Sequence, residues 1–156
     1  MNAAVLEHTP TYEQERGKPT PSRNHSIVEA NLGTELAKHK DFRVMTELSL
    51  ELNGRPLTPD LSVYPRQPVD FRHDQVQLTE PPVTVVEILS PTQGSLAVMD
   101  KMGFYLQSGV KSCWVVNPPQ RAITIYTPDG GLKTFVEGQV KDPATGLTAD
   151  LGAVFS

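Results

Sequence analysis

VTVVEIL, at residues 83–89, is the stretch that decides the fold. Apart from one threonine and Glu87 it is a continuous apolar, β-branched run, which is typical of a strand covered on both faces of a sheet. The pattern then predicts a helix over 95–108 that ends at Gly109, followed by a second apolar strand, SCWVV at 112–116. A strand, a helix and a strand in this order form a crossover unit, so the two strands are predicted to be parallel neighbours.

The segments on either side of this unit extend it into a small α/β (α+β) sheet. A helix is predicted from about residue 24 to 39. From 42 to 52 apolar residues alternate with polar ones, which indicates a half-buried strand. An Asn-Gly pair at 53–54 predicts a hairpin turn into a second strand at 57–64. A further hairpin is predicted over 122–136.

Length, charge and hydropathy limit the class of protein. The chain has 156 residues, the size of one ordinary domain, and a net charge of −4. Residues 1–22 are polar with little periodicity, so we expect an N-terminal arm followed by a single domain over 23–156. The acidic balance argues against a protein that coats DNA, but it allows an enzyme with a local basic face and a metal. The sequence has no signal peptide and no apolar run near the ~20 residues of a membrane span, so we expect a cytoplasmic protein.

Glu87 and Asp60 are the first candidates for chemistry. A lone carboxylate in an apolar strand costs free energy unless it is paired, protonated or bound to a metal; the plain alternative is a place at a solvent-exposed sheet edge or a pairing with an arginine. Asp60 follows Pro59 at the entry to a strand that can lie beside residues 83–89. Two carboxylates at one end of a sheet can hold Mg²⁺, although a Pro-Asp pair alone is also common in turns.

Lys101 is the third candidate. It lies one helix beyond Glu87, and its long side chain could reach back over the end of the strand. A lysine there could hold the attacking water or stabilise negative charge on a phosphate. Judged alone, it is more simply a solvated helix lysine. Cys113, in the second apolar strand, is interpreted as a buried core thiol.

A set of short motifs follows in a fixed order along the chain. They are Pro59-Asp60, VEILSP at 86–91, Lys101 with Tyr105 and Gly109-Val110, and CWVVNP at 113–118. This ordered set resembles the Uma-two family, a bacterial branch of the PD-(D/E)xK nuclease superfamily, and the resemblance covers about residues 20–156. It implies a restriction-endonuclease-like core, a mixed β-sheet flanked by helices.

The resemblance also implies roles for single residues. Asp60, Glu87 and the backbone carbonyl of Ile88 would be the metal ligands. The superfamily places a lysine two residues after the glutamate, but that position is Leu89 here, which points to Lys101 on the following helix. Tyr105 lies four residues after Lys101, where it could orient the lysine or simply pack.

The first helix supplies further candidates. The resemblance implies an acidic residue on this helix, which points to Glu29, although a helix-capping role explains Glu29 about as well. His25 is more readily a structural or phosphate-side residue than a ligand. Glu47, on the alternating strand, faces either the site or only solvent, and solvent is the favoured prediction.

The implied function is a Mg²⁺- or Mn²⁺-dependent endonuclease that hydrolyses phosphodiester bonds of DNA. A homodimer is expected, because cutting two strands needs two sites, and the N-terminal arm and the 65–81 loop could form its interface. The alternative is a catalytically inactive descendant of the fold that serves as a binding or assembly module. A weaker third reading is a metal-dependent hydrolase of another phosphate ester.

Overall fold

The computed structural model describes residues 20–91 and 94–156. Residues 1–19, most of the predicted N-terminal arm, therefore lie outside the described residues. The elements in chain order are α2 (Arg23–Leu36), β1 (Phe42–Thr46), β2 (Leu50–Leu52), β3 (Arg55–Leu57), β4 (Leu61–Pro65), β5 (Thr84–Ile88), α3 (Ser95–Gln107), β6 (Ser112–Asn117), β7 (Ala122–Tyr126), β8 (Leu132–Phe135), β9 (Gln139–Lys141), β10 (Thr148–Asp150) and α4 (Leu151–Val154).

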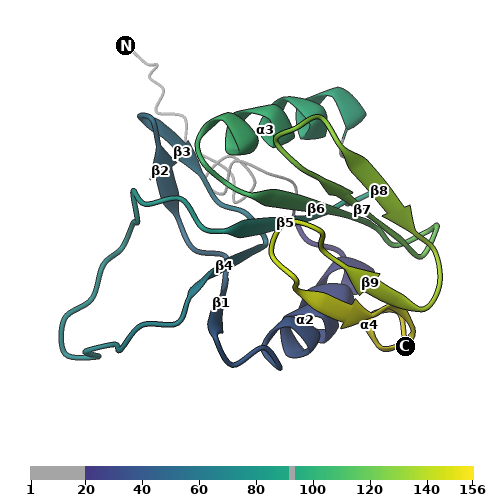
Figure 1. Ribbon diagram of the computed structural model, residues 1–156, viewed down its shortest axis with the longest axis horizontal. Helices are drawn as coiled ribbons and strands as arrows, with labels where there is room; N and C mark the ends of the chain where they lie inside the picture. Colours follow the sequence, from purple (N-terminus) through teal and green to yellow (C-terminus); the bar gives the residue numbers. More distant parts are fainter. Residues whose placement is uncertain (1–19, 92–93) are drawn as a thin grey trace, which may run out of the picture.

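A six-stranded mixed sheet in the order β1-β4-β5-β6-β7-β8 forms the centre of the molecule. Strands β5 and β6 are parallel and are joined by α3, as the crossover unit predicts, and the other neighbours are antiparallel. Helix α3 covers one face of the sheet, while α2, α4 and the β9–β10 hairpin cover the other (Figure 1). The predicted α/β class with a mixed sheet flanked by helices is confirmed.

Strand β5 is buried on both faces, as its apolar sequence predicts. Val86 and Ile88 pack in the core beneath α2, whereas Val85 packs in the core beneath α3. Because successive side chains of a strand point to opposite faces, Glu87 shares the α3 face with Val85. The candidate carboxylate is thus placed inside the α3 side of the protein.

The alternating segment 42–52 is not one strand, contrary to the sequence prediction. Strand β1 ends at Thr46 because Glu47 adopts a left-handed backbone with φ of 52°, which an extended strand does not contain. Strand β1 pairs with β4 in the main sheet, while β2 and β3 form a separate hairpin. The predicted strand 57–64 is also divided, since Thr58, Pro59 and Asp60 separate β3 from β4. The Asn-Gly turn is confirmed, with positive φ at Asn53 and Gly54.

Helix α3 packs through a face other than the one its sequence suggests. Leu96 and Met99, two apolar residues near its start, are 85% and 49% exposed. The buried side chains are Val98, Met102 and Tyr105. Apolar residues occur on more than one side of this helix, so periodicity alone does not identify the packed side.

The connection between β4 and β5 extends away from the sheet as a long loop (Figure 1). Its residues 66–77 are all exposed, and Phe71 and Val76 are 88% and 90% exposed. Cys113 is fully buried, as predicted. Within the described ranges, no helix is both long and apolar enough to span a bilayer.

Candidate active site

The structure brings Asp60 and Glu87 together on neighbouring strands. Leu61 is opposite Val86 in the antiparallel β4–β5 pair, so Asp60, one residue earlier, lies opposite Glu87. Asp60 and Glu87 are each only 1% exposed. The two carboxylates whose meeting the sequence predicts are therefore buried neighbours.

Asp60 is held from two sides. Its Oδ2 accepts a hydrogen bond of 2.7 Å from the backbone N–H of Ile88, and its Oδ1 lies 3.2 Å from Nε2 of His25. His25 is in the first turn of α2 and is 5% exposed. The N–H and C=O of one strand residue point to the same edge of the strand. The carbonyl of Ile88, a predicted ligand, is therefore directed to the side on which Asp60 lies.

Glu87 is contacted from the opposite helix. The hydroxyl of Tyr105 on α3 donates a hydrogen bond of 3.1 Å to Oε2 of Glu87. Burial, followed by the charge of Glu87, raises the pKa of Tyr105 far above its usual range, so the hydroxyl stays protonated as a donor. Tyr105 was predicted to orient Lys101 or to pack; it contacts the carboxylate itself.

Lys101 lies one turn before Tyr105 on the same side of α3 and is partly buried. It makes no hydrogen bond or ion pair with any residue in the described ranges. The helix thus places Lys101 near the approach to Glu87 but does not bring its ammonium group onto the carboxylates. Its neighbour Asp100 pairs with Arg55 at 3.2 Å.

A second group of polar side chains gathers on the α2 side. Glu29 lies 3.9 Å from Nδ1 of His25, measured from its Oε1, and also hydrogen-bonds to Glu47. Burial, then the hydrogen bond and charge of Glu47, raises the pKa of Glu29 to about 7. These residues line a pocket of about 300 Å³ with Pro21, Ser26, Ala30 and Thr46. Of the two predicted environments of Glu47, the favoured one, solvent alone, is wrong, since the residue is partly buried and lines this pocket.

His25, Glu29 and Asp60 offer a compact set of ligand atoms. One nitrogen and two carboxylate oxygens from these residues all lie within 4.8 Å of one another. The sequence favours a structural or phosphate-side role for His25 over a ligand role, and it allows either a site role or a capping role for Glu29. The cap at the start of α2 is instead Ser22, whose hydroxyl accepts from the backbone N–H of His25 at 3.2 Å.

Comparison with known families identifies the group to which this site belongs. The family model Uma2, described as "Putative restriction endonuclease", matches residues 13–152. The chain belongs to the Uma2 family. The resemblance that the motifs carry is therefore confirmed, and membership of Uma2 supports a nuclease with DNA as its substrate.

A solved structure supports the same fold. The chain is similar to a crystal structure described as "a putative nuclease belonging to DUF820" from Anabaena variabilis, with a TM-score of 0.74 and 23% sequence identity. The similarity covers 88% of this chain and 83% of the other. No curated protein matches the chain. The fold of the Uma2 chain is thus shared with a protein described as a nuclease.

The donor set of this Uma2 site fits a hard divalent cation. Asp60, Glu87 and the Ile88 carbonyl supply oxygen atoms, and oxygen is the ligand atom that Mg²⁺ and Mn²⁺ prefer. Asp60 and Glu87 are both buried and hold facing backbone positions, although the compact set of ligand atoms is made by Asp60 with His25 and Glu29 rather than with Glu87. Glu29 and His25 offer further ligand atoms next to Asp60.

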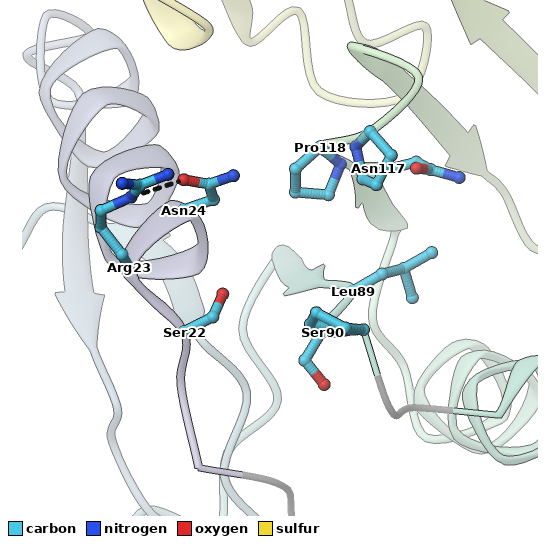
Figure 2. Close-up of a pocket in the computed structure, with 9 residues that line it drawn as sticks. Ser22, Arg23, Asn24, Leu89, Ser90, Asn117 and Pro118 are labelled. Carbon is cyan, nitrogen blue, oxygen red and sulfur yellow. Dashed lines mark hydrogen bonds between the residues drawn. The ribbon is translucent and has the colours of Figure 1, made fainter.

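A larger pocket of about 500 Å³ lies at the carboxyl ends of β5 and β6 (Figure 2). Sequence reasoning did not find it, because its walls come from three separate segments. They are the first turn of α2 and the residue before it, the segment after β5 and the turn after β6. The lining residues are Ser22, Arg23, Asn24, Leu89, Ser90, Pro91, Asn117, Pro118 and Pro119.

Proposed function

We propose that this chain is a divalent-metal-dependent endonuclease that hydrolyses phosphodiester bonds of DNA. The observation that carries the proposal is the buried pair of Asp60, directly before β4, and Glu87 in β5, which hold facing positions in a member of the Uma2 family. Two buried carboxylates at facing positions are costly unless hydrogen-bond donors or cations compensate them. A metal site for a phosphate substrate accounts for that arrangement.

Asp60, Glu87 and the carbonyl of Ile88 would hold Mg²⁺ or Mn²⁺. When bound, the ion supplies charge neutralisation at a phosphoryl oxygen and lowers the pKa of a water molecule. The neighbouring side chains fix the ligands: His25 and the Ile88 N–H hold the two oxygens of Asp60, and Tyr105 holds Glu87. Such outer partners orient the ligand atoms before substrate arrives.

Lys101 has a separate role in the proposal. Its ammonium group holds the attacking water or stabilises the negative charge that develops on the phosphate. Its place one turn before Tyr105, with no ion pair to any described residue, leaves the side chain available to swing toward a bound substrate. His25 and Glu29 are the additional site residues, as further ligands or as supports of Asp60.

A nuclease assay tests this proposal. Supercoiled plasmid and linear DNA are incubated with the wild type and with Asp60→Ala, each with Mg²⁺, Mn²⁺ or EDTA. We expect cleavage by the wild type that depends on the metal and is lost in Asp60→Ala. Asp129→Ala, which removes an exposed turn carboxylate, is the matched control and should cleave normally. Equal cleavage by the wild type and Asp60→Ala would exclude the proposed site.

One observation favours a second candidate, a catalytically inactive binding or assembly module. The position two residues after Glu87 is Leu89 rather than lysine, and Lys101 makes no contact with the carboxylates, as far as the described residues go. Calorimetry with Mn²⁺ separates the two candidates. A module without the metal site binds no Mn²⁺ through Asp60 or Glu87, whereas the nuclease binds it and loses binding in Asp60→Ala.

We also propose that the protein acts as a homodimer. The 66–77 loop extends from the sheet and carries three exposed apolar side chains, Val69, Phe71 and Val76, and apolar side chains gathered on one exposed segment can form an interface with a second copy. Light scattering on the wild type and on Phe71→Ser with Val76→Ser tests this. A dimer that becomes monomeric in the variant supports the loop as its interface, and a monomeric wild type contradicts the dimer.

A further inference from the structure

The pocket of about 500 Å³ described above has two chemically different walls. On one wall, the start of α2 contributes Arg23 and Asn24, and the Arg23 guanidinium donates a hydrogen bond of 3.1 Å from Nε to the Asn24 side chain. On the other, Pro118 faces Asn24 across the opening (Figure 2). The pocket thus has a basic, hydrogen-bonding wall and an apolar one, and its volume falls in the ~300–1,000 Å³ range of small-ligand sites.

The basic wall suits a phosphate group. Helix α2 has 14 residues and carries no acidic side chain of its own in its first turn, so the positive end of its dipole faces the pocket without a carboxylate at position 23 or 24. By helix geometry, the backbone N–H groups of Arg23 and Asn24 have no partner within the helix. The Arg23 guanidinium adds a full positive charge beside them. An anion at this end of the pocket would meet both backbone donors and a cation.

The remaining lining suits a flat, partly apolar ring with polar edges. Leu89, Pro118 and Pro119 offer aliphatic surface against which a base can lie. Asn24 offers an amide donor and acceptor on the opposite wall, whereas the Asn117 side chain points away from the opening (Figure 2) and its oxygen accepts a hydrogen bond from the backbone N–H of Gln120. The edge of a base that lies on the aliphatic wall would therefore meet Asn24.

The pocket lies close to the carboxylate site, because both walls of the pocket are connected to that site by only a few residues of chain. Leu89 is two residues from Glu87, so their Cα atoms are at most about 7 Å apart along an extended backbone. On the other wall, Ser22 caps the helix turn that carries His25 onto Asp60. A strand of nucleic acid whose phosphate lies at Asp60 and Glu87 would therefore reach this pocket with its neighbouring nucleotide.

We infer that the pocket between the start of α2 and the Pro118 turn binds one nucleotide of the substrate strand, next to the phosphate that is cleaved. Its base lies against Leu89 and Pro118, and its own phosphate lies at Arg23 and the α2 N-terminus. The inference rests on the proposed function, since it names the part of the substrate that this neighbouring pocket takes. It makes Arg23, Asn24 and Pro118 substrate-binding residues.

An abasic scan tests the inference without any change to the protein. The probe is a fluorescein-labelled thymidine oligonucleotide, compared with a series in which one base at a time is replaced by an abasic site. Anisotropy titrations in Ca²⁺ measure affinity at equilibrium, and therefore need no turnover. Because removal of a base loses the apolar surface that it buries against Leu89 and Pro118, we expect one position at which base removal weakens binding by about fivefold or more.

Three variants connect that position with the pocket. Pro118→Trp fills the space, so the oligonucleotide should bind more weakly and the abasic position should no longer matter. Asn24→Ala, at the exposed start of the helix, should reduce the same position dependence. Arg23→Ala should weaken all oligonucleotides alike and lower the salt dependence of binding by about one phosphate contact. The matched controls are Pro128→Trp in an exposed turn and Lys141→Ala on an exposed strand, and both should bind as the wild type does.

The outcomes separate this inference from the proposed function. Metal-dependent cleavage with no abasic position that matters, or with full position dependence in Pro118→Trp and Asn24→Ala, would overturn the pocket and leave the nuclease intact. If the position-dependent binding persisted in Asp60→Ala while the wild type cleaved no DNA, the nucleotide-binding pocket would be supported and the proposed nuclease function would be rejected. Thymidine monophosphate that binds as tightly as the oligonucleotide would overturn the strand site in favour of a free-nucleotide site.

Discussion

The two helices that flank the Asp60–Glu87 pair meet it in different ways. From α2, His25 lies on the Asp60 carboxylate at 3.2 Å, and Glu29 lies beside His25. From α3, Tyr105 reaches Glu87, but Lys101 reaches neither carboxylate among the described contacts. The α2 side chains are therefore already in contact around the proposed metal site. On the α3 side, the Lys101 side chain would reach the site only when a negatively charged substrate is bound. We expect the residues of α2 to determine metal affinity and those of α3 to determine the rate of the chemical step.

Glu87→Gln should have the largest effect, because both sides depend on this residue. It keeps the shape and the Tyr105 contact but removes the negative charge proposed to hold the metal. Charge stabilisation by a catalytic metal is worth several kcal/mol, so we expect cleavage to fall about a thousandfold or more. Cleavage rates and Mn²⁺ calorimetry measure this. If cleavage persisted with unchanged Mn²⁺ affinity, the metal would not lie between the two helices.

Lys101→Met tests the α3 side alone. Methionine keeps much of the apolar stem but not the ammonium group. We expect kcat to fall by about 10²–10³, as when one charge-stabilising donor is removed, while Mn²⁺ affinity stays as in the wild type. Lys111→Met, an exposed lysine beyond the same helix, is the control. An unchanged kcat in Lys101→Met would contradict the role of Lys101 in the chemical step, and Tyr105 would be the remaining α3 residue proposed to act at the site.

His25→Phe tests the α2 side in the same way. Phenylalanine keeps an aromatic ring in the buried position but removes the nitrogen that lies 3.2 Å from Asp60. Loss of a partner that orients a metal ligand costs about 10–100-fold in metal affinity, so excess Mn²⁺ should restore most of the rate. A fall in kcat that saturating Mn²⁺ does not restore would show that the two sides do not divide their roles as we propose.

The sequence predicts the α3 side of the site better than the α2 side, for physical reasons. The β5–α3–β6 unit is predictable because each strand is a uniform apolar run and crossover units have one common arrangement. The Asp60–Glu87 pairing follows once β4 returns beside β5. The contact between His25 and Asp60 depends on how α2 is placed across the sheet, and no local pattern encodes a contact between residues so far apart in the sequence.

Other features escape sequence reasoning because they depend on single dihedral angles or on assembled surfaces. Glu47 ends β1 through a positive φ that carries no residue signature, since the non-glycine residues that adopt it most often are Asn and Asp. Its proximity to Glu29 follows from that one backbone angle. The larger pocket is likewise invisible, because the α2 start, the Leu89–Pro91 segment and the Pro118 turn meet only in the folded chain.

Glu29→Gln should change how stability depends on pH. The folded pKa of Glu29 is about 7, raised from the usual 4.5 by burial and then by Glu47. The unfolded chain therefore loses this proton first, and the stabilisation present below pH 4.5 is lost as pH rises through 7. In EDTA, Glu29→Gln should match the wild type near pH 4.5 and exceed its thermal midpoint at pH 8. An equal pH dependence in both proteins would mean that Glu29 is not held against Glu47.

The smallest expected effect isolates the backbone at Glu47. Both Glu47→Gly and Glu47→Ala remove the carboxylate, so the difference between them reports the left-handed conformation alone. Because that conformation costs a side-chain-bearing residue roughly 1 kcal/mol and costs glycine little, Glu47→Gly should be more stable than Glu47→Ala by about 1 kcal/mol in urea unfolding.

The preceding residue, Thr46, is extended in β1 and serves as the control. There the order should reverse, with Thr46→Gly less stable than Thr46→Ala, because an extended strand gives glycine no steric advantage and a larger loss of chain entropy. The same order at both positions would mean that Glu47 stores no backbone strain, and the α2 side would then owe its assembly to side-chain contacts alone.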